Sequence, residues 1–460
     1  MNTLLINPPW QILRDSNVWK GVSSVMPPLG LAWLAASLEQ DGHVVRILDA
    51  NAEGFDLKDI MRWIAEHGPF EMFGLTSTTP LIKNALTIAR AARVAYPTAR
   101  IVLGGVHPTV LPDEVLAESA VDCVCRGEGE VTARELAAGL PFEQIKGLSW
   151  RRDGVVVHNP ERELIHNLDS LPMPAYHLLP MAKYRPAAGA AKRTPATSLL
   201  ATRGCPGRCT FCYRIFGQRL RYRSGIKVAA EVRHLQDRYG IKEICFYDDT
   251  FTAVKKETRA FCREVIDTKM DLTWSCFTRV DAFDEELFRL MKEAGCHQVM
   301  YGVETPVPEI LRNINKKFTA EQVERVIVAT KKIGLDVRAT FMLGNPGDTE
   351  ATLEENIRFA IKLDPDLALF NITTPFPGTV MFDWAEANGF LLTKDWADYD
   401  LSGPVMALPT VSPETVKRYY EMAHKRFYFR PRYILRRIWR LRSPEEFISA
   451  WRGLTTMLGF

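Results

Sequence analysis

The stretch "SLLATRGCPGRCTFCYR", residues 198–214, joins a short apolar run to three closely spaced cysteines. The run "SLLATRG" predicts a buried strand. Cys205, Cys209 and Cys212 follow it directly in a C-x₃-C-x₂-C pattern. In α/β folds, functional groups gather in the loops at the carboxyl ends of parallel strands. The stretch therefore predicts a βα fold with a group of thiols at the end of one strand.

The spacing of the three cysteines suits one face of an iron–sulfur cubane. A [4Fe–4S] cluster normally takes four cysteines, so with three of them one iron keeps an open coordination position. A zinc knuckle would need a fourth Cys or His beside the other ligands, and none follows in this loop. We therefore expect a [4Fe–4S] site with one corner open for a substrate or cosubstrate. The other six cysteines fall in predicted strands or helices and are expected to be core residues.

Strand-like runs alternate with helical patterns along most of the chain, which predicts an α/β fold. A doubly wound, Rossmann-like sheet is expected over residues 1–140, followed by a hairpin and linker over 141–196 that turns at Asp153-Gly154. A partial (β/α)6 TIM-like barrel is expected over 197–400 and a helical, basic C-terminal region over 401–460. The expected strands of the sheet are "TLLINP", "VVRILDA", "MFGLTST", "RIVLGGV" and "DCVCRGE", and those of the barrel are "SLLATRG", "EICFYDD", "TWSCFTR", "QVMYGVE", "DVRATFML" and "LALFNITTP".

Composition and charge narrow the class of protein. The 460 residues are 47% hydrophobic and 25% charged, which is typical of soluble globular proteins of two or three domains. No apolar run is long enough to span a bilayer, and the start lacks the pattern of a signal peptide. We therefore expect a cytoplasmic protein with reduced thiols. The net charge of +3 gives no reason to expect nucleic-acid binding.

The positive charge is concentrated near the C-terminus. Residues 417–442 carry ten Lys or Arg against one acidic residue, Glu421, so this segment has a net charge of +9. Because the whole chain has a net charge of +3, the rest of the chain has a net charge of −6. In "RPRYILRRIWRLR" the arginines alternate with apolar residues, as in a helix that lies at a membrane interface. The same helix could instead pack on the barrel with its arginines in solvent. Both alternatives stay open, and the first predicts peripheral contact with the inner face of the membrane.

The cysteine loop resembles that of the radical S-adenosylmethionine (SAM) superfamily, because the C-x₃-C-x₂-C motif follows the first barrel strand and Phe211 precedes its last cysteine. The resemblance implies that the open iron binds SAM and that the reduced cluster cleaves it to a 5′-deoxyadenosyl radical. It also implies a low-potential electron donor such as flavodoxin or ferredoxin.

Other stretches of the barrel resemble the SAM contacts of that superfamily. Asp248 in "FYDD" matches the contact to the methionine amino group, and Glu304 in "YGVET" matches the ribose contact. Arg338 would pair with the SAM carboxylate, and Gly344 in "FMLGNPGDT" lies where the backbone meets adenine. Two alternatives need no ligand. Asp248 could cap a helix, and Arg338 could form a surface ion pair.

The N-terminal 140 residues are similar to the cobalamin-binding domain that precedes many radical SAM barrels. "PPLGLAWLAASLEQDGHVVRILDAN" and "GGVHPTVLPDE" carry this resemblance. It implies that cobalamin lies on Ser77, Thr78, Gly104 and Gly105. The D-x-H-x-x-G motif that supplies a histidine to cobalt is absent, so His107 would line the ligand without binding cobalt. The alternative is a Rossmann-like scaffold without cobalamin, in which His107 is solvated.

Together these features predict a cobalamin-dependent radical SAM enzyme that methylates an unactivated carbon. Related enzymes similar to the anaerobic magnesium-protoporphyrin ester cyclase, or to ring-contracting enzymes, keep both cofactors without transferring methyl. A non-catalytic iron–sulfur sensor is the third alternative, and it would not cleave SAM. The substrate and any catalytic side chain beyond the cofactor contacts cannot be read from the sequence.

Overall fold

A computed structural model describes residues 1–10, 24–187 and 189–440. The N-terminal part is a seven-stranded sheet in the order β2-β1-β3-β4-β5-β6-β7. Its first five strands are parallel and its last two are antiparallel. The strands are β1 Asn2–Asn7, β2 Val44–Asp49, β3 Met72–Thr76, β4 Arg100–Gly104, β5 Cys123–Cys125, β6 Leu148–Arg152 and β7 Val155–His158.

Helices cover this sheet on both faces, as a doubly wound fold requires. They are α1 Leu29–Gln40, α2 Ala50–Glu53, α3 Leu57–His67, α4 Ile82–Ala95, α5 Val106–Val110, α6 Pro112–Leu116 and α7 Glu130–Ala137. The hairpin predicted at Asp153-Gly154 is confirmed, because Arg152 pairs with Val155 across that turn. Its strands β6 and β7 continue the sheet, so the sheet extends beyond residue 140 to His158.

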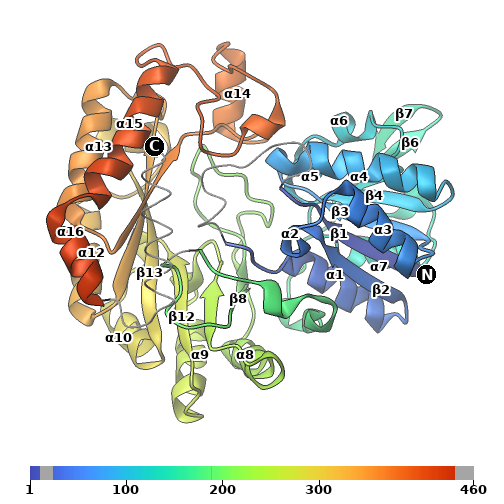
Figure 1. The fold of residues 1–460 in the computed structure, drawn as a ribbon, viewed down its shortest axis with the longest axis horizontal. Helices are drawn as coiled ribbons and strands as arrows, with labels where there is room; N and C mark the ends of the chain where they lie inside the picture. Colours follow the sequence, from blue (N-terminus) through green and yellow to red (C-terminus); the bar gives the residue numbers. More distant parts are fainter. Residues whose placement is uncertain (11–23, 188, 441–460) are drawn as a thin grey trace.

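The second part is an open half-barrel of six parallel strands in the order β15-β14-β13-β12-β11-β8, drawn in green to orange beside the blue to teal N-terminal sheet (Figure 1). The order is linear, so β8 and β15 are its two edges. The strands are β8 Ala196–Leu199, β11 Glu243–Phe246, β12 Thr273–Thr278, β13 Cys296–Glu304, β14 Asp336–Leu343 and β15 Leu367–Ile372. The helices that cover its outer face include α8 Gly225–Tyr239, α9 Lys255–Asp267, α10 Glu285–Glu293, α12 Ala320–Ile333 and α13 Glu350–Leu363.

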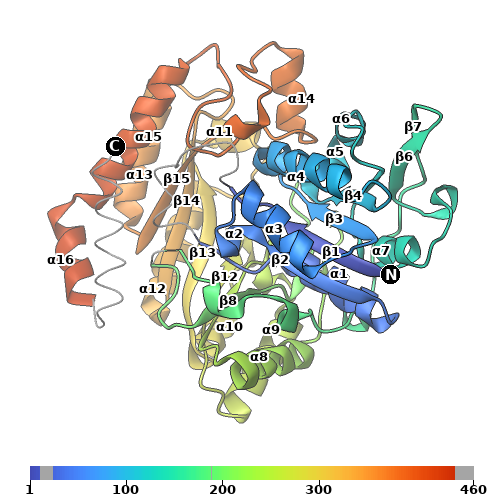
Figure 2. The same cartoon turned by 45° about the vertical axis from the view of Figure 1, so that its right-hand side comes forward.

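The expected fold class is confirmed, and the two parts share their cores. One apolar cluster runs from α1 through the connecting segment into the half-barrel, and it includes Trp33, Tyr176 and Leu199. The connecting segment is held to both sides, since Tyr184 Oη donates to Asp49 Oδ2 at 2.9 Å and Tyr176 Oη donates to Glu231 Oε1 at 2.6 Å. The described residues of the connecting segment, 160–187 and 189–195, therefore pack between the sheet and the half-barrel (Figure 2).

The C-terminal region is helical, as predicted, over its described residues. Helix α14 Val380–Ala387 follows the loop after β15, and α15 Pro413–Tyr428 and α16 Pro431–Arg440 lie beside α13 on the outer side of the barrel (Figures 1 and 2). Tyr428 Oη donates to Ala368 O at 2.6 Å and accepts from Ala368 N at 3.2 Å. Helix α15 thereby covers the free edge of β15, which would otherwise present unpaired backbone groups.

Candidate functional site

The three cysteines lie in a loop that is closed at its base by a two-residue ribbon. Strand β9 Thr202–Arg203 pairs antiparallel with β10 Arg221–Tyr222, so residues 204–220 form the loop. The loop continues from β8 at the carboxyl end of the half-barrel. Cys205 and Cys209 are half-buried and Cys212 is exposed, and all three thiols are free. The six other cysteines are buried, which confirms the prediction that they are core residues.

Three free cysteine thiols in one loop are the donor set that a [4Fe–4S] cluster with one open iron requires. Burial, the carboxylate of Asp249 and the charges of Cys209 and Cys205 together raise the pKa of Cys212 to about 11. Three anionic sulfurs this close together need a bound cation, because each raises the pKa of the next. Within the described residues, no three His, Cys, Asp or Glu side chains are close enough to hold one metal ion. A cubane differs, since each cysteine binds a different iron.

Backbone contacts hold the tip of the cysteine loop to two other barrel loops. Thr210 N donates to Ile314 O at 3.1 Å, and Asn315 Nδ2 donates to Arg208 O at 2.7 Å. Thr210 O accepts from Met381 N at 2.9 Å. The segment after β13 and the start of α14 therefore support the loop from two sides, which keeps the thiols in place before any cofactor binds.

Two cations lie beside the cysteine loop. A Cβ on Gly207 would lie 2.6 Å from Arg279 Nη1, so this glycine lets the loop pass closely over the guanidinium. Lys316 Nζ is 5.8 Å from the centroid of the Phe211 ring. Burial lowers the pKa of Lys316, but the nearby Glu304 carboxylate and the charge of Cys209 outweigh burial and raise it. Both side chains can offset the negative charge of a thiolate-bound cluster.

Glu304 lies at the end of β13, as predicted, in a buried ion pair. Its Oε1 is 2.9 Å from Lys316 Nζ, and its Oε2 accepts a hydrogen bond from Thr340 Oγ1 at 3.3 Å. Glu304 has a φ of +65°, and the pairing of β13 with β14 shifts register between Gly302 and Glu304. A non-glycine residue in this conformation is strained, and such strain is most common at functional sites.

Asp248 follows β11 and supports the base of the cysteine loop. Its Oδ1 accepts hydrogen bonds from Ala201 N at 2.9 Å and from Thr202 Oγ1 at 2.6 Å, and also from Thr202 N. Burial raises the pKa of Asp248 to about 6. It caps no helix, because its bonds go to the strand segment before the loop. Its neighbour Asp249 is exposed and acts on the Cys212 thiol.

Arg338 is a half-buried cation whose Nε is buried without a hydrogen-bond partner among the described residues. It lies in β14, five residues before the strand ends at Leu343, so it is deeper in the half-barrel than the cysteine loop. Burial lowers the pKa of its guanidinium, and the groups that partly offset this effect, Tyr247, Tyr428 and Cys245, include no carboxylate. Among the described residues, Arg338 forms no surface ion pair.

Gly344 follows β14 with a φ of +82° and is held by its own loop. Its N donates to Asp348 Oδ2 at 3.1 Å, and an added Cβ would meet Val416 Cγ1 of α15 at 3.0 Å. The residue is buried, so its Cα side faces helix α15 rather than an open surface.

The loops after β3 and β4 of the N-terminal sheet lie side by side. Ser77 N donates to Gly104 O at 2.9 Å, and Ser77 is buried whereas Thr78 is exposed. Gly105 has a φ of +98°, and a Cβ there would lie 2.7 Å from Ser77 O. The close approach that requires glycine at 105 is therefore to the backbone of Ser77.

His107 is fully buried on the domain boundary. Its ring packs edge-on against Trp396, with centroids 5.4 Å apart, and its Nε2 lies 3.7 Å from Glu114 Oε1. Trp396 Nε1 donates to the same carboxylate oxygen at 2.6 Å. The imidazole is thus neither solvated nor on an open surface, and its contacts are to α6 and to the C-terminal region.

Loops from the two halves of the molecule meet at Gly378, in the loop between β15 and α14. A Cβ on Gly378 would lie 3.2 Å from Tyr213 Cδ2 of the cysteine loop. It would also lie 2.4 Å from Val110 Cγ1, at the end of α5. The loop after β4 and the cysteine loop are therefore neighbours across this glycine.

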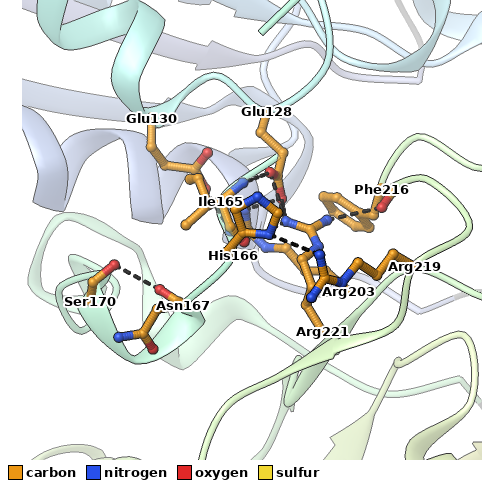
Figure 3. Close-up of polar contacts among 10 residues, drawn as sticks. All are labelled: Glu128, Glu130, Ile165, His166, Asn167, Ser170, Arg203, Phe216, Arg219 and Arg221. Atoms are coloured by element: carbon orange, nitrogen blue, oxygen red, sulfur yellow. Dashed lines mark hydrogen bonds and ion pairs between the residues drawn. The ribbon is translucent and has the colours of Figure 1, made fainter. Parts of the chain in front are cut away.

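Several side chains around the site have no signal in the sequence. Lys316 follows no strand directly, and Arg203 and Arg221 look like ordinary residues of short polar stretches. The "RGEGE" segment, 126–130, stands out as a strand-end loop, but its glutamates bind these two arginines of the barrel side (Figure 3). The pairing depends on long-range packing that no local pattern reveals.

Comparison with known proteins agrees with both halves of the fold. Residues 20–137 match the B12 binding domain and residues 199–360 match the Radical SAM superfamily. The chain is 38% identical to the uncharacterized methyltransferase PH0819 of Pyrococcus horikoshii, over 95% of each chain. It is 29% identical to the anaerobic magnesium-protoporphyrin IX monomethyl ester cyclase of Rubrivivax gelatinosus, over 83% of this chain and 70% of the cyclase.

A solved structure shows the same fold. The radical S-adenosylmethionine methyltransferase TsrM of Kitasatospora setae, with cobalamin and a [4Fe–4S] cluster bound, has a TM-score of 0.67 and 20% identity. The match covers 91% of this chain and 81% of TsrM. From the matched domains, the full-length relative and the free thiols of the cysteine loop, we conclude that the chain belongs to the cobalamin-dependent radical SAM methyltransferases, whose cofactors are a [4Fe–4S] cluster, SAM and cobalamin.

Proposed function

We propose that this protein methylates an unactivated carbon of its substrate where the loop after β4 and the cysteine loop meet. The observation that carries this proposal is the contact at Gly378, which joins Val110 of the cobalamin-binding half to Tyr213 of the cysteine loop. Methyl transfer to a carbon radical needs the radical source and the methyl source to lie close to one substrate atom. Two cofactor sites at opposite ends of the molecule could not meet that requirement.

The residues proposed to hold the cofactors come from both halves. Cys205, Cys209 and Cys212 hold the cluster, and the surface at Thr78, Gly104 and Gly105 faces cobalamin. The bound cluster supplies one-electron cleavage of SAM, and cobalamin supplies a methyl group for carbon. His107 stays a predicted lining residue without a bond to cobalt, and its imidazole is buried against Trp396.

For SAM, Asp248 stays the proposed contact of the methionine amino group, because its Oδ1 holds the base of the loop while its Oδ2 has no hydrogen-bond partner among the described residues. Asp249 is proposed as a second candidate, since it is exposed and close enough to raise the pKa of Cys212. The Glu304–Lys316 pair stays the proposed ribose contact, and the backbone around Gly344 the proposed adenine contact.

Arg338 is proposed to bind a carboxylate, since a buried guanidinium without an anion is costly. The SAM carboxylate is the expected partner. Because Arg338 lies well below the strand ends, an acidic group of the substrate is the alternative source of the same chemistry. Binding of SAM by an Arg338→Met variant separates the two, since only the first requires weaker SAM binding.

Two partners are part of the proposal. The exposed Cys212 leaves the cluster loop accessible to an electron donor such as flavodoxin or ferredoxin. Within the described chain, no helix is long and apolar enough to cross a membrane. The exposed apolar side of α16 supports peripheral contact with an anionic membrane, and a cytoplasmic location is the matching prediction.

The test of this function is anaerobic reconstitution with iron and sulfide. The wild-type protein should bind about four irons per chain, bind cobalamin, and release 5′-deoxyadenosine from SAM when reduced. The triple variant Cys205→Ala, Cys209→Ala and Cys212→Ala should lose the iron, its visible absorption and all SAM cleavage, while Cys245→Ala should keep them. Full iron content in the triple variant would refute the cluster site, and absent SAM cleavage in the wild type would favour a non-catalytic protein.

A further inference from the structure

Both ends of the cysteine loop are bound by one carboxylate from the other half of the molecule. In the ribbon at the base of the loop, Arg203 of β9 pairs with Arg221 of β10. Glu128 follows β5, and its Oε1 accepts a hydrogen bond of 2.8 Å from Arg203 Nη1. Both oxygens of the Glu128 carboxylate also accept hydrogen bonds from Arg221 Nη1, each 2.8 Å long. The three side chains converge as Figure 3 shows.

The rest of the network leaves these groups little freedom. Glu130 Oε1 accepts from Arg203 Nη2 at 2.5 Å, and Ile165 N donates to Glu128 Oε2 at 2.8 Å. Arg221 Nη2 donates to Phe216 O, which lies within the cysteine loop, at 2.9 Å. The side chains of Glu128, Arg203 and Arg221 are 3%, 3% and 2% exposed. Two carboxylates and two guanidiniums are thus buried together, and their charges balance.

Aromatic rings fix the plane of one guanidinium. Arg203 Cζ lies 4.9 Å from the centroid of the Trp33 ring in α1 and 5.2 Å from that of Phe216 in the cysteine loop. A planar cation between two rings, with a fork of donors toward Glu128 and Glu130, has one orientation. Arg203 therefore contacts helix α1, the loop after β5 and the cysteine loop at once.

Stability alone is a poor reason for such a network. A buried ion pair is often no more stabilising than apolar side chains of the same size, so its usual benefit is a defined geometry. The apolar core between the two halves already supplies their adhesion. The hydrophobic effect is non-directional, however, so it defines the orientation of one half against the other less sharply than directed hydrogen bonds do.

We propose that Glu128 is a positioning residue which, through Arg203 and Arg221, sets the cluster-binding loop relative to the cobalamin-binding half. This inference rests on the proposed function, because it concerns the spacing of the two cofactors. The contacts of Glu128 are to Arg203, Arg221 and Ile165 N, so it is proposed to act through these groups. Its effect reaches the cluster through the two strands that begin and end the loop, at Cys205 N, bonded to Gly217 O at 3.3 Å, and beyond.

The experiment measures the spacing of the cofactors without any substrate. In the holoenzyme, cob(II)alamin and the reduced cluster are both paramagnetic, so the reduced cluster speeds the spin relaxation of cob(II)alamin in a distance-dependent way. The microwave power that half-saturates the cob(II)alamin signal is recorded with the cluster oxidised and then reduced. Iron and cobalt contents are determined on the same samples. Amide exchange over 201–222 is measured separately on the apoprotein.

Three variants separate positioning from charge balance. Glu128→Gln leaves two arginines with one carboxylate, so the position of the cysteine loop should become less well defined. The spin relaxation that the cluster induces in cob(II)alamin should then show a range of rates, most of them slower than in the wild type. Amide exchange over 201–222 should become faster. Glu128→Gln with Arg221→Gln restores neutrality and should recover thermal stability but not the wild-type relaxation. Lys83→Gln removes an exposed pair between the two halves, Lys83 Nζ to Asp395 Oδ1 at 2.7 Å, and should behave as wild type.

The outcomes are distinct for each claim. Wild-type relaxation in a Glu128→Gln protein with full iron and cobalt would overturn the positioning role. Recovery of both stability and relaxation in the neutral double variant would also overturn it, because charge balance would then suffice. A wild-type protein that binds no cobalamin would instead contradict the proposed function, and if Glu128→Gln fails to fold, the double variant still decides the question.

Discussion

Asp248 is a carboxylate buried without a cation, and this gives it a measurable effect on stability. Burial raises its pKa to about 6 from an ordinary value of 3.8. Between these two values the folded protein holds a proton that the unfolded chain has released. Asp248 therefore makes the free energy of unfolding fall as pH rises through this window, by about 3 kcal/mol in total.

The Asp248→Asn variant tests this effect, because asparagine keeps the Oδ1 acceptor and the shape but cannot ionise. Relative to Asp248→Asn, the wild-type apoprotein should lose melting temperature as pH rises from about 4 to about 6 and change little above that. Calorimetry at several pH values measures the difference. Asp153→Asn, at the exposed hairpin turn, is the control, and parallel pH profiles for wild type and Asp248→Asn would refute the burial argument.

Glycine is required at position 105 for a reason that the sequence shows only in part. Its place in a glycine loop suggested that a side chain would enter the space for cobalamin. The structure adds that a Cβ would first meet Ser77 O at 2.7 Å, in a backbone with φ of +98°. No sequence pattern could show that contact, because β3 and β4 come together only in the folded sheet.

Gly105→Ala should therefore destabilise the apoprotein itself, by roughly 1–3 kcal/mol, as expected for strain combined with a backbone clash. Gly42→Ala is the matched control. It has a φ of +78° but nothing within 4 Å of an added Cβ, so only the conformational cost of about 1 kcal/mol applies. Melting temperatures of the two variants decide the point, and equal losses would contradict the clash.

Secondary-structure elements with long apolar runs were predicted close to their observed bounds. The run "DVRATFML" matches β14 Asp336–Leu343 in full, since its apolar residues alternate with partly exposed ones and then run on into three buried positions. The ribbon β9–β10 was not predicted, because two-residue strands have no periodicity. The carboxyl-end placement of the cysteines, Asp248 and Glu304 was predictable from βα order alone, whereas Glu128 pairing with Arg203 was not.

Helix α16 packs on the half-barrel, but not in the way its sequence suggested. The packed alternative placed its arginines in solvent, whereas in the structure its apolar residues are exposed. Arg436 of this helix and Arg430 just before it face the protein, since Arg430 Nη2 donates to Asp364 Oδ1 at 2.8 Å and Arg436 also binds that carboxylate. Arg432, in contrast, is exposed. Tyr433 is buried beside them and donates to Asp366 O at 2.9 Å. The apolar residues Ile434, Leu435, Ile438 and Trp439 are exposed. A pattern of alternating Arg and apolar residues defines two faces but not which of them packs.

Asp364 should therefore anchor α16. It ends α13 with a φ of +47°, and asparagine also tolerates this conformation, so Asp364→Asn removes mainly the charge. Amide exchange over 431–440 should become faster, while α13 keeps its protection. Arg418→Gln, which breaks an exposed pair with Glu350 at 3.1 Å, is the control and should change nothing there. Unchanged exchange in Asp364→Asn would show that Tyr433 packing holds the helix alone.

For the molecule as a whole, the exposed side of α16 predicts binding to anionic liposomes. Apolar insertion would be joined by an attraction of about 1 kcal/mol for each arginine near the surface, weakened by salt. Trp439→Glu should abolish co-sedimentation and spare SAM cleavage, because Trp439 is 86% exposed. Ile226→Glu, an equally drastic change at an exposed site on α8, should leave binding intact. No liposome binding by the wild type at low salt would refute the membrane contact.

The central claim is that both cofactor sites serve one methyl transfer, and methyl-labelled SAM tests it most directly. Reconstituted, reduced holoenzyme is incubated anaerobically with trideuteromethyl SAM and cell extract, and products are analysed by mass spectrometry. The account predicts 5′-deoxyadenosine together with a product that has gained a trideuteromethyl group on carbon. An altered but unlabelled product formed with 5′-deoxyadenosine would contradict methylation and identify a cyclase or rearrangement enzyme that uses the same two cofactors.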